Sequence, residues 1–320
     1  MSEPLDPLDT YDPLDTFDLV VAERRQEAEG VVSLLLRRPD GAPLPAWEAG
    51  AHIDLILSEA EGLERQYSLC GGDTRSWRIA VLRERDGRGG SAHVHGELQE
   101  GAAVRARGPR NHFRLEPAPA YRFVAGGIGI TPIVPMLSAA ADQGARWSLH
   151  YGGRSRATMA FAEELADRHP DGRIELVEGL LDLPAVLAEL RPGELVYACG
   201  PEPLLAAVEE LVPAEVLRTE RFTPTATDTS GDTAFEVELA SCGRTLKVPA
   251  DRTILATLQE AGVQVLYSCT EGTCGTCETD VLAGEVDHRD SVLTAAEREA
   301  GETMMVCVSR ARGERLTLDL

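Results

Sequence analysis

Three closely spaced cysteines and a fourth further along the chain have the spacing of an iron–sulfur ligand set. Cys269, Cys274 and Cys277 follow the pattern C-x4-C-x2-C, and Cys307 comes after 29 intervening residues. Four thiolates with this spacing hold 2Fe–2S clusters, and soft thiolates bind iron well. Gly272 lets backbone N–H groups approach the cluster sulfurs. The spacing predicts a 2Fe–2S cluster. A four-thiolate zinc site is the alternative, although zinc ligands usually come in two short C-x2–4-C pairs.

Two glycine-rich segments could bind phosphate groups. Gly87–Ser91 (GRGGS) precedes a short helical stretch, with Ser91 as the expected N-cap. AGGIGITP, at 125–132, joins an apolar strand to an amphipathic helix, which Thr131 is expected to cap and Pro132 to begin. Helix starts of this kind bind anions through backbone N–H groups. The second segment is not G-x-G-x-x-G, so the sequence does not predict a standard Rossmann dehydrogenase.

The elements that must position these motifs fall into successive blocks. Residues 1–16 repeat DPLDT and predict a disordered acidic tail. Short strands separated by Gly or Pro fill 17–116 and predict an antiparallel β-barrel. Strands alternate with helices over 117–222, which predicts a parallel sheet covered by helices on both faces. A Thr-rich linker, 223–233, leads to 234–320, where we expect a small α+β domain with a hairpin, a helix and three final short strands.

Composition excludes several classes of protein. The 320 residues are 43% hydrophobic and 26% charged, so the chain as a whole is not disordered. No apolar run is long enough to span a membrane. The net charge of −22 disfavours nucleic acid and anionic membrane surfaces. The start lacks the features of a signal peptide, so we expect a cytoplasmic protein. Seven cysteines, an odd number, argue against a disulfide framework.

The motifs and their order resemble those of the phthalate dioxygenase reductase family, which includes the vanillate demethylase reductases. The chain carries R-x-Y-S at 65–68, G-G-x-G-x-T-P at 126–132, C-G-P-x-x-L at 199–204 and E-x-F at 220–222. The likeness covers residues 17–320. It implies an antiparallel β-barrel that binds FMN, a ferredoxin-reductase-like α/β domain that binds NAD(P)H, and a C-terminal β-grasp ferredoxin domain with a plant-type 2Fe–2S cluster.

The resemblance assigns roles to residues of the flavin site. Tyr67 can stack on the flavin ring, Ser68 can donate a hydrogen bond to flavin N5, and Arg65 can pair with its phosphate. Phe222 is expected beside the flavin, with ordinary core packing as the alternative. The sequence by itself does not distinguish FMN from FAD. The complete set implied for FMN is Arg65, Tyr67, Ser68, Arg83, Gly89, Gly90, Ser91, Glu220 and Phe222.

The resemblance also assigns roles in nucleotide binding. Cys199 is expected near the nicotinamide, with a plain core thiol as the alternative. Two arginines, Arg154 and Arg156, could pair with the 2′-phosphate of NADPH, whereas the family mostly uses NADH. We therefore expect NADH and keep NADPH open. The complete set implied for NAD(P)H is Gly127, Gly129, Thr131, Arg154, Ser155, Arg156, Cys199, Gly200 and Pro201.

These features together predict the reductase component of a two-component oxygenase system. Hydride from NAD(P)H would pass to the flavin, with Ser68 and Cys199 as the catalytic residues, and electrons would then pass singly through the cluster. The expected acceptor is a Rieske oxygenase or demethylase, with a haem-thiolate monooxygenase as the alternative. The acidic C-terminal domain suggests a basic docking patch on that partner. A redox-sensing module without turnover is the alternative from another class. The family leads us to expect a monomer.

Overall fold

The computed structural model describes residues 15–58, 60, 62–170, 173–224 and 228–320. Most of the predicted acidic tail, and residues 225–227 of the predicted linker, lie outside these ranges. The chain divides into two compact units, one ending at Glu220 and the other beginning at Arg221. Within the described residues, no helix is long and apolar enough to cross a membrane.

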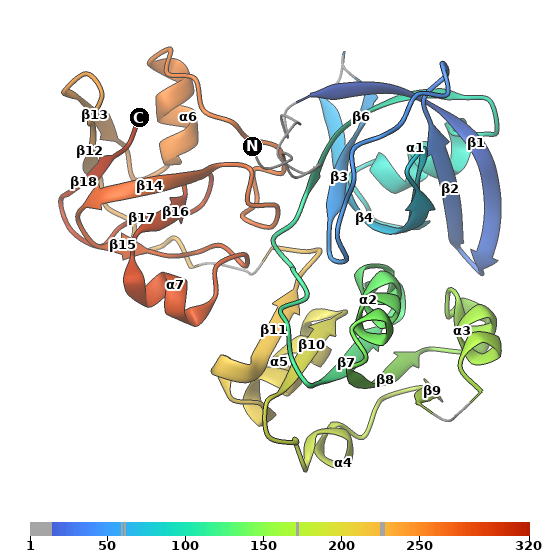
Figure 1. Cartoon of the computed structure of the whole chain (residues 1–320). Coiled ribbons are helices and arrows are strands. Elements are labelled where there is room, and N and C mark those ends of the chain that lie inside the picture. Colours follow the sequence, from blue (N-terminus) through green and yellow to red (C-terminus); the bar gives the residue numbers. More distant parts are fainter. Residues whose placement is uncertain (1–14, 59, 61, 171–172, 225–227) are drawn as a thin grey trace, which may run out of the picture. The chain divides into compact units, whose positions relative to one another are not determined.

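A closed antiparallel barrel begins the first unit, as the sequence predicts (Figure 1). Its strands follow one another around the barrel in the order β1-β2-β5-β4-β3-β6. Apolar residues from different strands, such as Leu34 of β2, Ile53 of β3 and Ile79 of β5, are fully buried inside it. Every second side chain of a strand points to the same face, so each strand can contribute to this core. The strands are β1 (Thr16–Ala28), β2 (Val31–Arg37), β3 (His52–Ser58), β4 (Leu63–Asp73), β5 (Ser76–Leu82) and β6 (Ala103–Arg110).

The helix predicted within the barrel region is α1 (Gly90–Glu97), but its N-cap differs from the expectation. The N-cap is Gly89, whose φ of +84° is in the left-handed region that glycine readily adopts. Ser91 lies inside the first turn, and its hydroxyl accepts a hydrogen bond from the backbone N–H of Glu84 at 3.1 Å. The prediction of Ser91 as N-cap is therefore wrong, because the tight glycine turn begins the helix one residue earlier than Ser91.

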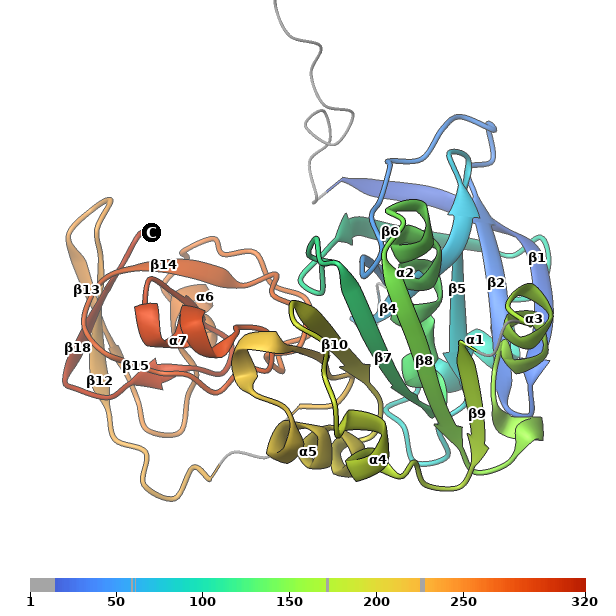
Figure 2. The ribbon, with the colours of Figure 1, turned by 60° about the horizontal axis from the view of Figure 1, so that its bottom comes forward.

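A five-stranded parallel sheet completes the first unit, with strand order β11-β10-β7-β8-β9. Alternate residues of β10 face different helices. Tyr197 and Cys199 pack in a core cluster with residues of α2 and α3, whereas Val196 and Ala198 pack with residues of α4 and α5. Helices therefore cover both faces, as predicted (Figure 2). The strands are β7 (Ala120–Gly126), β8 (Arg146–Gly153), β9 (Ile174–Glu178), β10 (Glu194–Cys199) and β11 (Leu217–Glu220).

In the described part of this region, four helices and three short 3-10 turns connect the parallel strands. Helix α2 also packs against β4 of the barrel, and Cys70 of β4 belongs to the same buried cluster as Ile133 and Met136 of α2. The barrel and the sheet thus share a core. The helices are α2 (Ile130–Asp142), α3 (Ala162–Arg168), α4 (Leu183–Leu187) and α5 (Glu202–Leu211), and the 3-10 turns are Gly127–Gly129, Arg156–Thr158 and Ala214–Val216.

The second unit is a β-grasp domain, built on a mixed sheet of order β13-β12-β18-β14-β16 and a separate pair, β15-β17. The predicted hairpin is β12–β13, which pair in antiparallel fashion. Ile254 and Leu258 of α6 are fully buried against the sheet. The elements are β12 (Phe235–Leu239), β13 (Arg244–Val248), α6 (Ile254–Glu260), β14 (Glu278–Ala283), β15 (Val286–Asp287), α7 (Ala295–Ala300), β16 (Thr303–Met305), β17 (Arg310–Ala311) and β18 (Arg315–Leu318).

The prediction that three short strands finish the chain is wrong. Five strands follow α6, and α7 stands among them. The sequence carries the signal for this helix. Thr294 and Glu297 form a reciprocal capping box at its start, and Gly301, with φ of +64°, ends it. Two of the missed strands, β15 and β17, are two residues long, which is too short for an alternating pattern to show.

Candidate functional site

The R-x-Y-S segment is in β4, and its arginine reaches the start of α1. One terminal nitrogen of Arg65 donates to the carbonyl of Glu64 and the other to that of Arg88, both at 2.7 Å. A Cβ on Gly90 would lie only 2.5 Å from Cγ of Arg65. Glycine at this position therefore lets the guanidinium lie directly over the helix start, and its remaining N–H groups can bind a phosphate there.

The tyrosine and the serine of the segment are shielded from solvent to different degrees. Tyr67 is partly buried at the edge of the barrel core, and burial raises the pKa of its phenol. Ser68 is 5% exposed, and its hydroxyl donates to a carboxylate oxygen of Glu220 at 3.5 Å. Ser68 belongs to the barrel and Glu220 ends β11 of the sheet, so the fold brings together two predicted flavin residues that are 152 positions apart in the sequence.

The carboxyl group of Glu220 has a raised pKa. Burial raises its pKa from 4.5 to about 8, although the hydrogen bond from Ser68 acts in the opposite direction. Removing a carboxylate from water is costly, so the neutral acid is favoured. The strand pairing places Glu220 beside Cys199 of β10. This side chain therefore lies between the predicted flavin and nicotinamide residues.

Two other predicted flavin residues have exposed side chains. Phe222 is 44% exposed, so the alternative of ordinary core packing is wrong. Arg83 is exposed just after β5, and its charge is close enough to α1 to contribute to the lowered pKa of His95, whose main cause is burial. Arg83 is thus near the helix whose start Arg65 contacts.

The G-G-x-G-x-T-P segment forms a tight turn between β7 and α2, and it packs against the C-G-P segment. A Cβ on Gly129 would lie 2.3 Å from the carbonyl oxygen of Cys199, and one on Gly126 would lie 2.8 Å from Pro201. A Cβ on Gly200 would lie 3.0 Å from Cα of Gly126. These glycines are required by backbone packing, which leaves the turn and the ends of β7 and β10 at one edge of the sheet, where open parallel sheets bind ligands.

The expected capping role of Thr131 is wrong. Gly129 is the N-cap of α2, and the hydroxyl of Thr131, inside the first turn, donates to the carbonyl of Ile128 at 3.0 Å. Pro132 is accordingly the third residue of the helix and not the first. The 3-10 turn Gly127–Gly129 runs directly into α2, so the helix starts earlier than the Thr-Pro pair indicates.

Cys199 is completely buried in the core cluster that includes Phe123 and Tyr151. Burial raises the pKa of its thiol well above the ordinary value, and the nearby Glu220 carboxylate adds to this. The side chain therefore has the burial expected of a core thiol, and its backbone carbonyl lies against the Gly129 turn. Gly200 and Pro201 follow, and Pro201 is the N-cap of α5.

The predicted ribose segment follows β8 on the same edge of the sheet. Arg154 and Arg156 are exposed. Ser155 caps the 3-10 turn Arg156–Thr158 and shares a capping box with Thr158. The hydroxyl of Ser155 is thus used in capping this turn, whereas Arg154 precedes Ser155 and Arg156 begins the turn.

Sequence reasoning missed Tyr151, which shapes the predicted nucleotide loop. The phenol of Tyr151, fully buried at the end of β8, donates to the carbonyl of Gly127 at 3.0 Å. This bond ties the glycine turn to the neighbouring strand. No motif marks Tyr151, because its partner is a backbone atom brought near only by the sheet register.

The four predicted cluster ligands come together in the second unit. Cys274, Cys277 and Cys307 are 2–3% exposed, and Cys269 is partly buried. Hydrogen bonds from Cys274 and Cys307 hold the pKa of Cys269 well below its usual range, and one from Cys307 lowers the pKa of Cys277. The backbone N–H groups of Glu271 and Thr273 donate to Sγ of Cys269 at 3.3 and 3.5 Å. Four adjacent thiols with amide donors fit a 2Fe–2S cluster.

Comparison with known proteins identifies both the domain and the family. Residues 237–312 match the family described as the 2Fe-2S iron-sulfur cluster binding domain. The chain is 45% identical over 305 residues to the phenoxybenzoate dioxygenase subunit beta of Ectopseudomonas oleovorans, covering 92% of this chain and 94% of that protein. It is 37% identical to a solved phthalate dioxygenase reductase, which is described as a modular structure for electron transfer from pyridine nucleotides to [2Fe-2S]; the match covers 95% and 98% of the two chains, with a TM-score of 0.68. The chain belongs to the phthalate dioxygenase reductase family.

A second solved structure shows the same three-part architecture within a larger protein. An intact type IV self-sufficient cytochrome P450 monooxygenase is 44% identical, with a TM-score of 0.89. The match covers 95% of this chain but only 41% of that one. The phthalate dioxygenase reductase fold thus occurs both as a separate reductase and as part of a fused oxygenase.

Family membership settles the reaction class. The chain is an NAD(P)H-dependent oxidoreductase with flavin and 2Fe–2S cofactors, and several of its relatives are named as reductase components of oxygenase systems. The four-thiolate zinc site and the sensor without turnover are therefore not supported.

Proposed function

We propose that this reductase uses FMN as its flavin and donates electrons to a separate terminal oxygenase. The observation that carries the proposal is the meeting of Ser68 and Glu220, 152 residues apart, at the carboxyl edge of the parallel sheet. A bound flavin takes up two electrons as a hydride and releases them singly, as a 2Fe–2S cluster requires. The chain's own residues supply binding, orientation and electrostatics for that exchange.

The barrel residues supply a phosphate site and a ring site. Arg65, together with the α1 start at Gly89, Gly90 and Ser91, would hold one phosphate, and Arg83 adds positive charge nearby. A single compact phosphate site favours FMN, which has one phosphate, over FAD. Tyr67 and Phe222 would flank the ring, while the hydroxyl of Ser68 would turn from Glu220 to donate a hydrogen bond to it.

The sheet residues would hold the nicotinamide nucleotide. The turn at Gly127 and Gly129, with the adjacent Thr131, offers backbone N–H groups to a pyrophosphate. Gly200 and Pro201 would border the nicotinamide. We assign Cys199 to shaping the backbone there, because its side chain is fully buried. Arg154, Ser155 and Arg156 would meet the adenosine ribose, and the exposed arginine pair supports use of NADPH beside NADH.

The partner that we favour is a Rieske oxygenase or demethylase that acts on an aromatic acid, a methyl ether or a quaternary amine. Relatives named as dioxygenase and carnitine monooxygenase reductase subunits support this class. A haem-thiolate monooxygenase is the second candidate, because the 44% identical solved chain is a fused cytochrome P450. In either case the acidic C-terminal domain favours a basic docking patch, with rates that fall as salt rises.

The proposal includes a protein that is a monomer in the cytoplasm. Its proposed domains are an acidic tail at 1–16, an FMN domain at 17–116, an NAD(P)H domain at 117–222, a linker at 223–233 and a ferredoxin domain at 234–320. The acidic composition, with a net charge of −22, supports a protein that repels its own copies.

An anaerobic visible spectrum of the full-length protein, recorded before and after adding NADH, tests the proposal. Flavin bands and cluster absorption that are both bleached by NADH are the expected result. Extraction of the flavin and its chromatography against FMN and FAD standards identifies it. A loaded protein whose flavin and cluster stay oxidised with both NADH and NADPH would contradict the electron route.

A further inference from the structure

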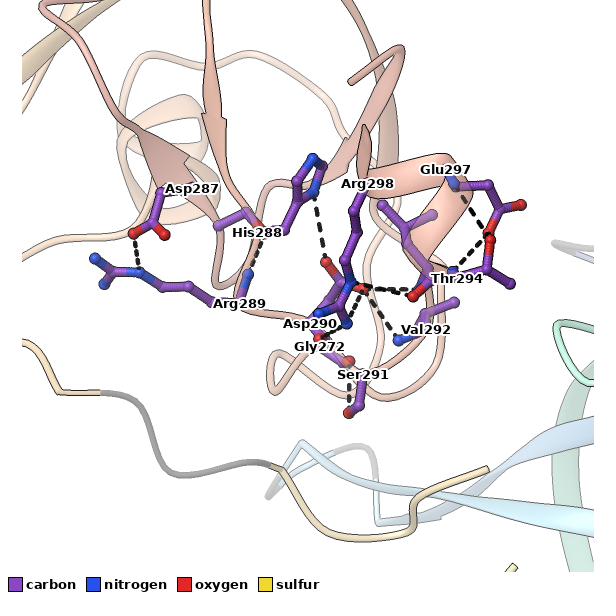
Figure 3. A network of polar contacts seen from close by, with 12 residues as sticks. Gly272, Asp287, His288, Arg289, Asp290, Ser291, Val292, Thr294, Glu297 and Arg298 are labelled. Carbon is purple, nitrogen blue, oxygen red and sulfur yellow. Dashed lines mark hydrogen bonds and ion pairs between the residues drawn. The ribbon is translucent and has the colours of Figure 1, made fainter. Parts of the chain in front are cut away.

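A segment outside all of the motifs, Asp287–Leu293, packs behind the loop that carries three of the cluster cysteines. Figure 3 shows Gly272 of that loop beside Asp290 and Ser291. The backbone N–H of Ser291 donates to the carbonyl of Gly272 at 2.9 Å. Gly272 has φ of +71°, and a Cβ there would lie 3.1 Å from Cα of Asp290 and 2.6 Å from Cγ2 of Val308. Only glycine fits this contact.

The carboxylate of Asp290 accepts hydrogen bonds from the backbone of its own segment. Its side chain is fully buried, and its Oδ2 accepts hydrogen bonds from the backbone N–H groups of Val292 and Leu293 at 3.0 and 2.8 Å. Arg298 of α7 lies 3.7 Å from the same oxygen and donates to the carbonyl of Leu293 at 3.1 Å. A buried carboxylate with two amide donors and a guanidinium beside it fixes the backbone around it.

On its other side, Gly272 lies between two donors to a cluster ligand. Glu271 precedes it and Thr273 follows it, and the backbone N–H groups of both donate to Sγ of Cys269. Hydrogen bonds to a ligating thiolate stabilise the added negative charge of a reduced cluster and so raise its potential. Movement of Gly272 would move both donors together.

We propose that Asp290 is a positioning residue for the cluster: by fixing the backbone that contacts Gly272, it keeps the amides of Glu271 and Thr273 on Cys269 and raises the reduction potential. The inference rests on the proposed function, because it takes a 2Fe–2S cluster to be bound at the four cysteines. The negative charge of Asp290 would by itself lower the potential, so position and charge have opposite effects.

Two substitutions separate these effects. Asp290→Asn removes the charge and keeps an oxygen that can accept from Val292 and Leu293. Asp290→Ala removes both the charge and the acceptor. Positioning predicts a potential for Asp290→Ala below that of Asp290→Asn, while Asp290→Asn equals or exceeds the wild type. An effect of charge alone predicts equal, raised potentials for both variants.

The experiment is an anaerobic redox titration of the full-length holoprotein, with iron content and the EPR spectrum of the reduced cluster measured on each sample. We expect the equilibrium constant for cluster reduction to be about tenfold lower in Asp290→Ala than in Asp290→Asn, which is 59 mV for one electron, with altered EPR g values. Asp287→Asn, on the same segment but only half-buried and paired with Arg289, is the control and should keep the wild-type EPR spectrum.

Equal potentials for the Asn and Ala variants at full iron content would overturn the inference and leave the proposed function intact. If Asp290→Ala does not fold, Asp290→Ser replaces it, since its shorter hydroxyl cannot hold both amides equally well; its potential is expected below that of the Asn variant, and equality would again overturn the inference. A wild-type protein without a 2Fe–2S EPR signal after reduction would instead overturn the proposed function, and this inference with it.

Discussion

The hydroxyl of Ser68 in β4 donates to the carboxylate of Glu220 at the end of β11 across 3.5 Å. The two residues are separated by 152 positions in the sequence. One belongs to the barrel and the other to the parallel sheet, and α2 packs between the sheet and β4. This contact places the predicted flavin site and the predicted nicotinamide site side by side, which hydride transfer requires.

Glu220 should make stability depend on pH. Its folded-state pKa is about 8, against 4.5 ordinarily. The unfolded chain therefore releases this proton at lower pH than the folded chain, and the folded state loses stability as pH rises from about 4.5 to 8. We expect the Tm of Glu220→Gln to exceed that of the wild type by an amount that grows across this window, measured by differential scanning fluorimetry. Glu178→Gln, exposed in β9, is the control. A constant difference would contradict the raised pKa.

Gly129→Ala should destabilise the nucleotide loop. The new Cβ would lie 2.3 Å from the carbonyl oxygen of Cys199. Overpacking of this kind costs about 1–3 kcal/mol, which lowers Tm by roughly 5 °C in a unit of this size. The KM for NADH should rise as the turn is displaced. Gly96→Ala in α1, where nothing lies within 4 Å of the new Cβ, should leave the KM unchanged and should not lower Tm, because alanine is favoured over glycine inside a helix. An unchanged Tm in Gly129→Ala would show that the close approach is relieved at little cost.

Cys274→Ser should separate electron transfer from NADH to the flavin from electron transfer through the cluster. With a cluster ligand removed, NADH-dependent reduction of cytochrome c should fall at least tenfold, while ferricyanide reduction, which the flavin alone can serve, should persist. Both are measured on the same samples with their iron content. Cys242→Ser, an exposed cysteine outside the site, should leave both activities unchanged. Equal loss of the two activities in Cys274→Ser would contradict the order flavin, then cluster.

Arg156→Ala tests the choice of nucleotide. If the exposed guanidinium pairs with a 2′-phosphate, its loss should cost about 1.5–3 kcal/mol, which is roughly a 10–100-fold lower kcat/KM for NADPH. The value for NADH should change little. Arg146→Ala, at the opposite end of β8, serves as the control for a general loss of charge. An unchanged NADPH/NADH ratio would remove this role from Arg156.

The sequence by itself determined the features that are encoded locally. The spacing of Cys269, Cys274, Cys277 and Cys307 identified the cluster, because the first three ligands share one short loop and must be close together whatever the rest of the chain does. Strand alternation over the first hundred residues indicated a barrel, and the strand–helix alternation after it indicated a parallel sheet, because each periodicity reports which side of an element is buried.

Only the tertiary structure decided what depends on distant backbone. The burial of Cys199, the bond from Tyr151 to the Gly127 carbonyl and the raised pKa of Glu220 all follow from how strands are ordered and which elements cover them. The N-caps of α1 and α2 are the glycines Gly89 and Gly129, whereas the sequence pattern indicated Ser91 and Thr131. Asp290 belongs to no motif, since its partners are backbone amides and a glycine 18 residues earlier. Such contacts leave no spacing pattern in the sequence, because they form only when the chain folds.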